Sequence, residues 1–323
     1  MIRTNGAHFK RSGLRRLGFV ALRFTLLPFL LREVFHRRKV AIVVYHAPAP
    51  DVFDAHLSLL KRLYNIVALS DFLAARRTGG AVRLPAKALI ITLDDGHRSN
   101  YALKAVIQKH DVPVTIFVCS GIVGTRRRFW FLHSATASVV QQLKAVSDIE
   151  RLQVLCSTGF EETREFEERQ ALSDSELEEL RARVDIQSHT VFHPILPRCQ
   201  SVRAEAEIVD SKRDLETRLG STVYAFAYPN GSYGNREVDL VQKAGYACAL
   251  TLDRGLNSNA TPLLKLRRIA LRDNTDQHEL LVKASGLWGY IKTILHSGRR
   301  RELRMVGLDN NEQIDAQRME LGR

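Results

Sequence analysis

Two adjacent carboxylates follow an apolar run in the stretch KALIITLDDGHRSN, residues 87–100. Asp94 and Asp95 repel one another, and the end of a buried strand is a costly place for both charges unless something uses them. A divalent cation that binds one carboxylate would offset the repulsion, and the other could then act as a general base. A simpler interpretation is an Asp-Asp-Gly turn in which Asp95 caps the next helix.

A pair of histidines in DIQSHTVFHP, residues 185–194, supplies further ligand candidates. His189 and His193 are four positions apart, which on a helical turn would place both imidazoles on one face. This spacing alone is a weak signal, because surface histidines also meet by chance. With a carboxylate from another strand it predicts a two-histidine, one-carboxylate set, whose open coordination positions are typical of a hydrolytic metal centre.

The elements that must position these residues alternate between strand-like and helix-like segments from residue 39 to residue 285. Short β-branched runs bounded by Gly, Pro and Asp, alternating with helices, are typical of parallel βα units. About seven strands are expected, so we predict an α/β fold with a barrel or barrel-like sheet. The carboxyl ends of its strands should bring together the Asp pair, the His pair, His46 and the YPNG loop at 228–231.

We divide the 323 residues into a basic, apolar leader at 1–39, a catalytic domain at 40–285 and a basic tail at 286–323. Within the catalytic domain the strand–helix rhythm is interrupted between about 121 and 183, where we predict an inserted helical cap.

Positive charge is concentrated in the leader. Its ten Lys or Arg face one acid, Glu33, so it supplies +9 of the net charge of +13. The apolar run at 17–31 is short for a bilayer span and contains Arg23 and Pro28. One interpretation is a partly disordered basic segment, and the one we favour is an amphipathic helix on an anionic membrane surface. No motif predicts nucleic-acid binding.

Four cysteines are scattered along the chain without a CxxC pair, at Cys119, Cys156, Cys199 and Cys248. The spacing indicates neither a disulfide framework nor a zinc knuckle, which favours a reducing compartment. Together with the basic, apolar leader, this spacing predicts a cytoplasmic protein that is peripheral at the inner membrane.

The motifs TLDDG, SHTVFHP and FAYPNG, in this order and spacing, resemble the polysaccharide deacetylase family, the NodB-homology carbohydrate esterases. The resemblance covers roughly residues 40–285. It implies a distorted (β/α) barrel and a divalent metal, commonly Zn²⁺, with Co²⁺, Ni²⁺ and Mn²⁺ as alternatives. It also implies hydrolytic removal of an acyl group, usually N-acetyl, from an amino sugar.

The resemblance also implies roles for individual residues. Asp94 would be the general base, and the backbone N–H of Asn230 would be the oxyanion donor. A Pro-Asn-Gly turn is a simpler interpretation of the same loop. The remaining roles are metal binding by Asp95, His189 and His193, and substrate binding by Tyr228, Pro229, Gly231 and Trp130.

Two positions depart from the family pattern. Many members have an arginine that orients the base where this chain has Ala227. Arg268 is our candidate substitute, and the alternative is a solvated arginine at a strand end. The usual acid histidine is also unclear, because His296 lies in the basic tail. In a permuted branch, resembling poly-N-acetylglucosamine deacetylases, this histidine comes from the first strand, which favours His46 as the general acid.

Aromatic side chains of the predicted insert, Trp130 with Phe129 and Phe131, have faces that suit sugar rings. Anchoring the insert to the barrel is the commoner role for such residues.

These features predict a metal-dependent deacetylase that acts on an amino-sugar glycan or a lipid-linked saccharide. The alternatives are a deformylase or O-acetyl esterase on the same scaffold, and an inactive scaffold that binds glycan or membrane.

Overall fold

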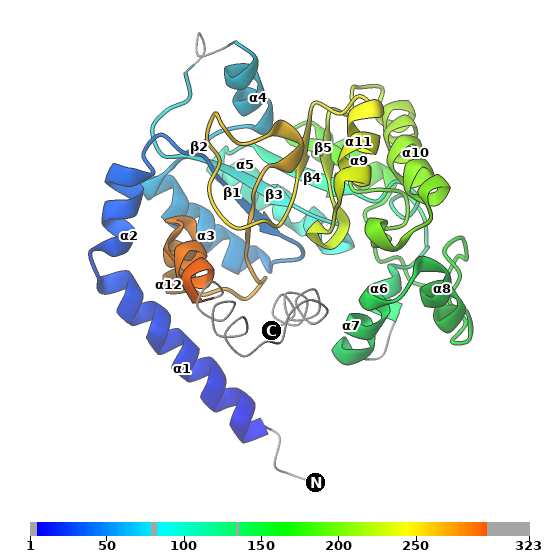
Figure 1. Cartoon of the computed structure of the whole chain (residues 1–323), viewed down its shortest axis with the longest axis horizontal. Helices are drawn as coiled ribbons and strands as arrows, with labels where there is room; N and C mark the ends of the chain where they lie inside the picture. Colours follow the sequence, from blue (N-terminus) through cyan, green and yellow to red (C-terminus); the bar gives the residue numbers. More distant parts are fainter. Residues whose placement is uncertain (1–4, 79–82, 134–135, 296–323) are drawn as a thin grey trace, which may run out of the picture.

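The computed structural model describes residues 5–78, 83–133 and 136–295, with side chains from residue 13 onward. Parallel strands form one curled sheet at the centre, with helices packed around it (Figure 1). Seven strands follow one another in the order β7-β6-β5-β4-β3-β1-β8, and β2 pairs with β3 beside this path. The strands are β1 (Ala41–Tyr45), β2 (Asn65–Ile66), β3 (Ala88–Leu93), β4 (Val114–Val118), β5 (Val184–Ser188), β6 (Ala225–Ala227), β7 (Cys248–Leu250) and β8 (Ile269–Ala270).

The central strands are apolar on both faces, as expected of a parallel sheet that helices cover on both sides. Every residue of β1 and β3 is buried. Their register pairs Ala41 with Leu89 and Tyr45 with Leu93, so the two strands end side by side. The residues that follow them, His46 and Asp94, therefore leave the sheet at the same edge.

The two ends of the sheet path approach each other through the segment that leads into β8. Leu250 at the end of β7 forms a parallel bridge with Leu266, and two residues of β8 pair with β1. The segment before β8 therefore lies beside β7, while β8 itself lies beside β1. The predicted distorted (β/α) barrel of about seven strands is confirmed.

The helices around the barrel bury their apolar sides against the sheet, and 3-10 turns connect several of them. The barrel helices are α3 (Pro50–Leu63), α4 (Leu69–Arg77), α5 (Lys104–His110), α9 (Asp174–Arg181), α10 (Ser201–Leu219), α11 (Asn235–Lys243) and α12 (Gln277–Ala284). The 3-10 turns are η2 (Arg98–Leu103), η3 (Leu196–Arg198), η4 (Pro229–Gly231) and η5 (Leu263–Lys265).

The region predicted as an inserted cap contains two kinds of helix. The helices α6 (Trp130–His133), α7 (Ala137–Ala145) and α8 (Asp148–Cys156) lie together at one side of the barrel (Figure 1). Their apolar side chains form a small cluster of their own with Ile195. By contrast, Leu177 and Leu180 of α9 belong to the main core, so α9 packs as a barrel helix.

The leader folds into helix α1 (Asn5–Phe24), the short helix α2 (Leu27–Leu30) and the π-helical turn η1 (Leu31–Phe35). Phe19 of α1 is buried against Val282 of α12, and its ring packs 4.8 Å from that of Trp288, centroid to centroid. An ion pair of 2.6 Å joins Arg15 to Glu279. The described residues of the leader up to Phe35 are therefore mostly helical, and one side of α1 packs against α12.

Candidate active site

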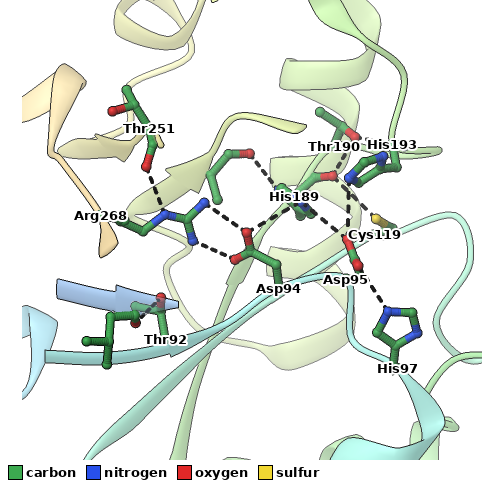
Figure 2. A network of polar contacts seen from close by, with 12 residues as sticks. Thr92, Asp94, Asp95, His97, Cys119, His189, Thr190, His193, Thr251 and Arg268 are labelled. Carbon is green, nitrogen blue, oxygen red and sulfur yellow. Dashed lines mark hydrogen bonds and ion pairs between the residues drawn. The ribbon is translucent and has the colours of Figure 1, made fainter. Parts of the chain in front are cut away.

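Polar side chains from distant parts of the chain meet at the carboxyl edge of the sheet (Figure 2). Asp94 and Asp95 directly follow β3, and His189 directly follows β5. Arg268 reaches the same place because the segment before β8 lies beside β7. The barrel thus brings together the Asp pair, the His pair and the arginine that the sequence singled out.

Asp94 is held by a bidentate, buried ion pair with Arg268. The guanidinium donates to the two carboxylate oxygens over 2.7 and 2.8 Å, and its Nε donates to the carbonyl of Thr251 over 3.1 Å. Burial alone would raise the pKa of Asp94, but the adjacent Arg268 and the nearby His189 outweigh it and hold that pKa below its usual value. Asp94 is therefore an ionised carboxylate, and Arg268 is the arginine that orients it.

Asp95, His189 and His193 turn their ligand atoms toward one point. All these atoms lie within 4.8 Å of one another and all three residues are buried. The Oδ1 atom of Asp95 is 3.5 Å from Nε2 of His189 and 3.4 Å from Nε2 of His193. Among the described residues this buried Oδ1 has no hydrogen-bond partner. A buried carboxylate oxygen without a donor, facing two imidazole nitrogens, fits a divalent cation such as Zn²⁺.

The surroundings prepare these three groups as ligands. Nδ1 of His189 lies 2.7 Å from the carbonyl oxygen of Ala227, so it carries the proton and leaves Nε2 to face Asp95. His97 contacts the other oxygen of Asp95 through its Nε2, over 3.0 Å. Burial would raise the pKa of Asp95, but its close contacts with His189, His97 and His193 hold that pKa well below its usual value.

The two histidines differ in their affinity for a proton. Burial lowers the pKa of His193 to about 3, so its imidazole is neutral at physiological pH. Burial also acts to lower the pKa of His189, but Asp94 and Asp95 outweigh it and raise that pKa overall. A cation at this site therefore competes with a proton for His189.

The histidines do not share a helical turn, which corrects our expectation from their spacing. They lie in a loop between β5 and η3. Thr190 and His193 have φ angles of 69° and 59°, which a right-handed helix cannot accommodate. The Oγ1 atom of Thr190 accepts a hydrogen bond of 2.9 Å from the backbone N–H of His193. A tight loop, rather than a helix face, turns both rings toward Asp95.

Glu207, on the buried side of α10, supports this loop from behind. Its Oε2 atom accepts hydrogen bonds from the backbone N–H groups of Val191 and Phe192, over 2.8 and 2.9 Å. Only 2% of Glu207 is exposed, so water cannot replace the carboxylate without a rearrangement. The sequence offered no signal for this role, because Glu207 stands among other charged residues of a long helix.

We expect Glu207→Ala to lower the free energy of unfolding by about 3 kcal/mol, since two backbone N–H groups lose their shared acceptor. Urea denaturation measures the change. Glu205→Ala is the matched control, because Glu205 is exposed on the same helix and its loss should change stability little. Equal stability of the two variants would show that Glu207 does not hold the histidine loop.

His46 directly follows β1, and its backbone is fixed at both ends. Its N–H donates to Asp273 over 3.2 Å, and its carbonyl accepts from Asn100 over 2.7 Å. The half-buried imidazole lies near enough to Asp94 to contribute to the lowered pKa of that carboxyl. The other histidine considered for the acid role, His296, lies outside the described residues.

The YPNG loop forms η4, with Asn230 and Gly231 at φ angles of 56° and 64°. A Cβ on Gly231 would come within 2.6 Å of the Leu252 side chain, so only glycine fits. Tyr228 and Pro229 are buried, and the Tyr228 hydroxyl donates to the carbonyl of Leu264. Our assignment of these two residues to substrate contact is therefore corrected, because they shape the loop from inside.

Trp130 is corrected in the same way. It is 1% exposed, and its indole N–H donates to the carbonyl of His193 over 2.8 Å. The guanidinium of Arg151 covers its ring at 4.7 Å from the centroid. With neither face open, Trp130 cannot stack on a sugar, and it anchors the insert to the histidine loop.

Two further side chains of this site escaped the sequence analysis. His97 contacts Asp95. Its position directly after the DDG motif is the sequence feature that could have identified it as a site residue. Lys144 of α7 donates to Oδ1 of Asn230 over 2.9 Å. Burial lowers the pKa of Lys144, and the charge of Asp95 opposes this, so the two groups lie within electrostatic range. No sequence pattern connects Lys144 to the loop, because the insert and the YPNG loop meet only in the fold.

The chain is similar in sequence and in fold to known proteins. The family model for polysaccharide deacetylase matches residues 81–249. YxkH of Bacillus subtilis, whose name places it provisionally among polysaccharide deacetylases, is 22% identical over 184 residues, which are 57% of this chain. The alignment covers 51% of YxkH, so the chain spans about half the length of this curated relative.

Solved structures share the fold. The Streptococcus pyogenes deacetylase PplD, in complex with acetate, has a TM-score of 0.58 and 22% identity, over 76% of this chain and 98% of PplD. IcaB from Ammonifex degensii has a TM-score of 0.55 and 19% identity, over 77% of this chain and 97% of IcaB. The family model spans more than half of the 323 residues and includes both the Asp and the His motifs. The chain therefore belongs to the polysaccharide deacetylase family.

Proposed function

We propose that the protein is a divalent-metal-dependent hydrolase that removes an N-acyl group, N-acetyl first, from an amino sugar of a glycan or lipid-linked saccharide. The observation that carries the proposal is that the two adjacent aspartates make different contacts. The Oδ1 of Asp95 faces two histidine nitrogens without a hydrogen-bond donor, while Asp94 is oriented by Arg268. A ligand and a free base side by side are what metal-assisted hydrolysis needs.

Asp95, His189 and His193 would hold the metal. When bound, a divalent cation supplies a Lewis acid that polarises the acyl carbonyl and makes water a stronger acid. Zn²⁺ suits this mixed nitrogen and oxygen set, and Co²⁺, Ni²⁺ and Mn²⁺ are the alternatives.

The other residues move protons and stabilise charge. Asp94, kept ionised by Arg268, accepts a proton from the attacking water. The backbone N–H of Asn230 stabilises the oxyanion that forms on the acyl group, and Lys144 holds the Asn230 side chain beside it. His46, near Asp94 at the same edge of the sheet, donates a proton to the leaving amine. Gly231 allows the loop to approach the substrate closely.

Acetyl is the acyl group we place first, supported by the acetate bound to the streptococcal deacetylase of similar fold. The catalytic unit is residues 40–285, as proposed from the sequence. The cytoplasmic location stays a prediction, and the cysteines in the described part of the chain are free thiols.

The metal part of the proposal is tested by binding. We expect the dialysed protein to bind one Zn²⁺ per chain in isothermal titration, and His193→Ala to weaken this affinity by about 100-fold or more. His133→Ala is the matched control, because His133 belongs to α6 and is outside the ligand cluster. Equal zinc affinity of the two variants would contradict the assignment of the ligands.

The reaction is tested by its product. Incubating the zinc-loaded protein with N-acetylated, N-formylated and O-acetylated amino-sugar oligomers should release acetate from the N-acetylated substrate. Release of formate alone would identify a deformylase, and release only from the O-acetylated substrate an esterase. If the protein binds zinc and hydrolyses none of these substrates, the inactive scaffold becomes the better account.

A further inference from the structure

The leader carries a second apolar face that the described part of the fold leaves open. On α1 the buried contacts face α12 and the helix at 287–295, through residues such as Phe19. Leu14, Leu17 and Phe24 are spaced by three and seven residues and so lie along another side of the helix. All three are exposed, and Leu14 and Phe24 are each 74% exposed. At the end of α1 the ring of Phe24 also lies 6.1 Å from that of His278 in α12, centroid to centroid.

This open face continues past the end of α1. We call the exposed apolar and basic side chains of residues 14–38 the leader surface. Its apolar members are Leu14, Leu17, Phe24, Leu26, Leu27, Phe29, Leu30, Val34 and Phe35. They are nine of the eighteen large exposed hydrophobic residues in the described part of the chain. Apolar side chains gathered in this way are typical of an interaction surface.

The charges around these side chains are positive. Arg16, Arg37 and Arg38 are exposed, and no acidic group within the described ranges lies within ion-pair distance of them. The acid of the leader, Glu33, is already neutralised by Arg32 at 2.7 Å and Lys87 at 3.0 Å. The leader surface is therefore apolar and cationic.

The positive charge of the leader surface distinguishes between two possible binding partners, a second copy of the chain and an anionic bilayer. A second copy of the chain would bring one cationic leader against another, and their repulsion would oppose association. An anionic bilayer would instead attract the arginines at its headgroups and accept the apolar side chains below them. In the described part of the chain no helix has the length and apolar character to cross a membrane. An orientation of α1 in the plane of the membrane interface fits both the apolar, cationic leader surface and the lack of a membrane-spanning helix in the described residues.

We propose that the leader surface docks the protein on an anionic lipid bilayer, with α1 lying in the interface. The leader enters β1 at Ala41, the end of the strand opposite to His46 and the candidate active site. Figure 1 also shows α1 and α2 on the other side of the barrel from α6, α7 and α8. The site and its insert would thus stay accessible when the leader is docked. This inference does not depend on the proposed function.

Co-sedimentation of the full chain with vesicles tests the proposal. We expect binding to vesicles of phosphatidylcholine mixed with phosphatidylglycerol, and weaker binding at high salt. Leu17→Glu with Phe24→Glu should raise the lipid concentration for half-maximal binding by about tenfold or more. Arg37→Gln with Arg38→Gln should weaken binding to the mixed vesicles by about tenfold or more, and change binding to pure phosphatidylcholine little.

The matched control is Val154→Glu with Val202→Glu, which adds the same charges at exposed apolar positions of α8 and α10. It should bind vesicles like the unaltered chain, and thermal melting should show all variants folded. Absent vesicle binding, or equal binding by the leader and control variants, would overturn the proposal. So would a dimer in sedimentation velocity that the leader variant dissociates, because a second copy would then cover the surface.

Discussion

Replacing Asp94 by Asn is expected to lower kcat/KM for deacetylation by about 10³-fold or more while the protein keeps its affinity for zinc. The amide cannot accept the proton of the attacking water, and general-base catalysis contributes about 10²–10⁴-fold. The affinity persists because Asp95, not Asp94, faces the two histidine nitrogens. Initial rates of acetate release, compared with zinc titrations of the same preparation, measure the two effects separately.

The matched control is Asp51→Asn, which makes the same change on the exposed first turn of α3. Its activity and zinc affinity should equal those of the unaltered protein. If Asp94→Asn retained full activity, the general base would have to be another residue. If it lost both activity and zinc, Asp94 would be a ligand rather than the base.

Replacing Arg268 by Leu is expected to shift the acidic limb of the pH–activity profile to higher pH by about one unit or more. Two influences now oppose each other at Asp94: burial raises its pKa, while Arg268, with His189, lowers it. Without the guanidinium, burial prevails and the carboxyl takes up a proton at a higher pH. Because only the ionised form can act as the base, activity at neutral pH falls. The profile of kcat/KM against pH measures the shift.

The same substitution should lower the free energy of unfolding by about 3–5 kcal/mol near neutral pH, because it leaves a buried carboxylate without its partner. The sign of the pH dependence follows from the pKa. In the unaltered protein the pKa of Asp94 is depressed. The ion pair therefore stabilises the fold fully above the pKa that Asp94 has in the unfolded chain, and this stabilisation is lost as the pH falls through the lower pKa of the folded state. In the variant the raised pKa relieves the destabilisation at acidic pH.

Arg267→Leu is the matched control, because Arg267 is exposed beside the buried Arg268. It should leave the pH profile and the stability near those of the unaltered protein. Arg268→Lys keeps the charge but loses the bidentate geometry, so we expect it to restore part of the pH profile. An unshifted acidic limb in Arg268→Leu would show that Arg268 does not control Asp94.

Much of the fold follows from local patterns in the sequence. A short apolar run before a polar turn indicates a buried parallel strand, and β1 and β3 are such runs, buried along their whole length. The alternation of strands and helices then indicates a parallel α/β sheet, and about seven strands favour a barrel-like one. The Asp and His motifs could be found in the same way, because each is a few residues long.

Contacts between distant residues could not be derived in this way. Arg268 is 174 positions from Asp94, and one bridge, Leu250 to Leu266, brings it beside the site. Local pattern left open whether this arginine pointed inward or into solvent. The same limit explains why the prediction that Trp130 and Tyr228 bind substrate was wrong. An aromatic residue near a site can face a sugar or the core, and packing decides which.

By itself, then, the sequence determined the family, the barrel and the two motifs that supply the ligands and the base. The tertiary structure alone decided that Arg268 orients Asp94, that a Glu207-supported loop turns the histidines toward Asp95, and that one face of α1 is buried while another stays open. The physical reason is range. Strand and helix patterns are set by residues within a few positions, whereas burial and ion pairing depend on which distant segments the closed sheet brings together.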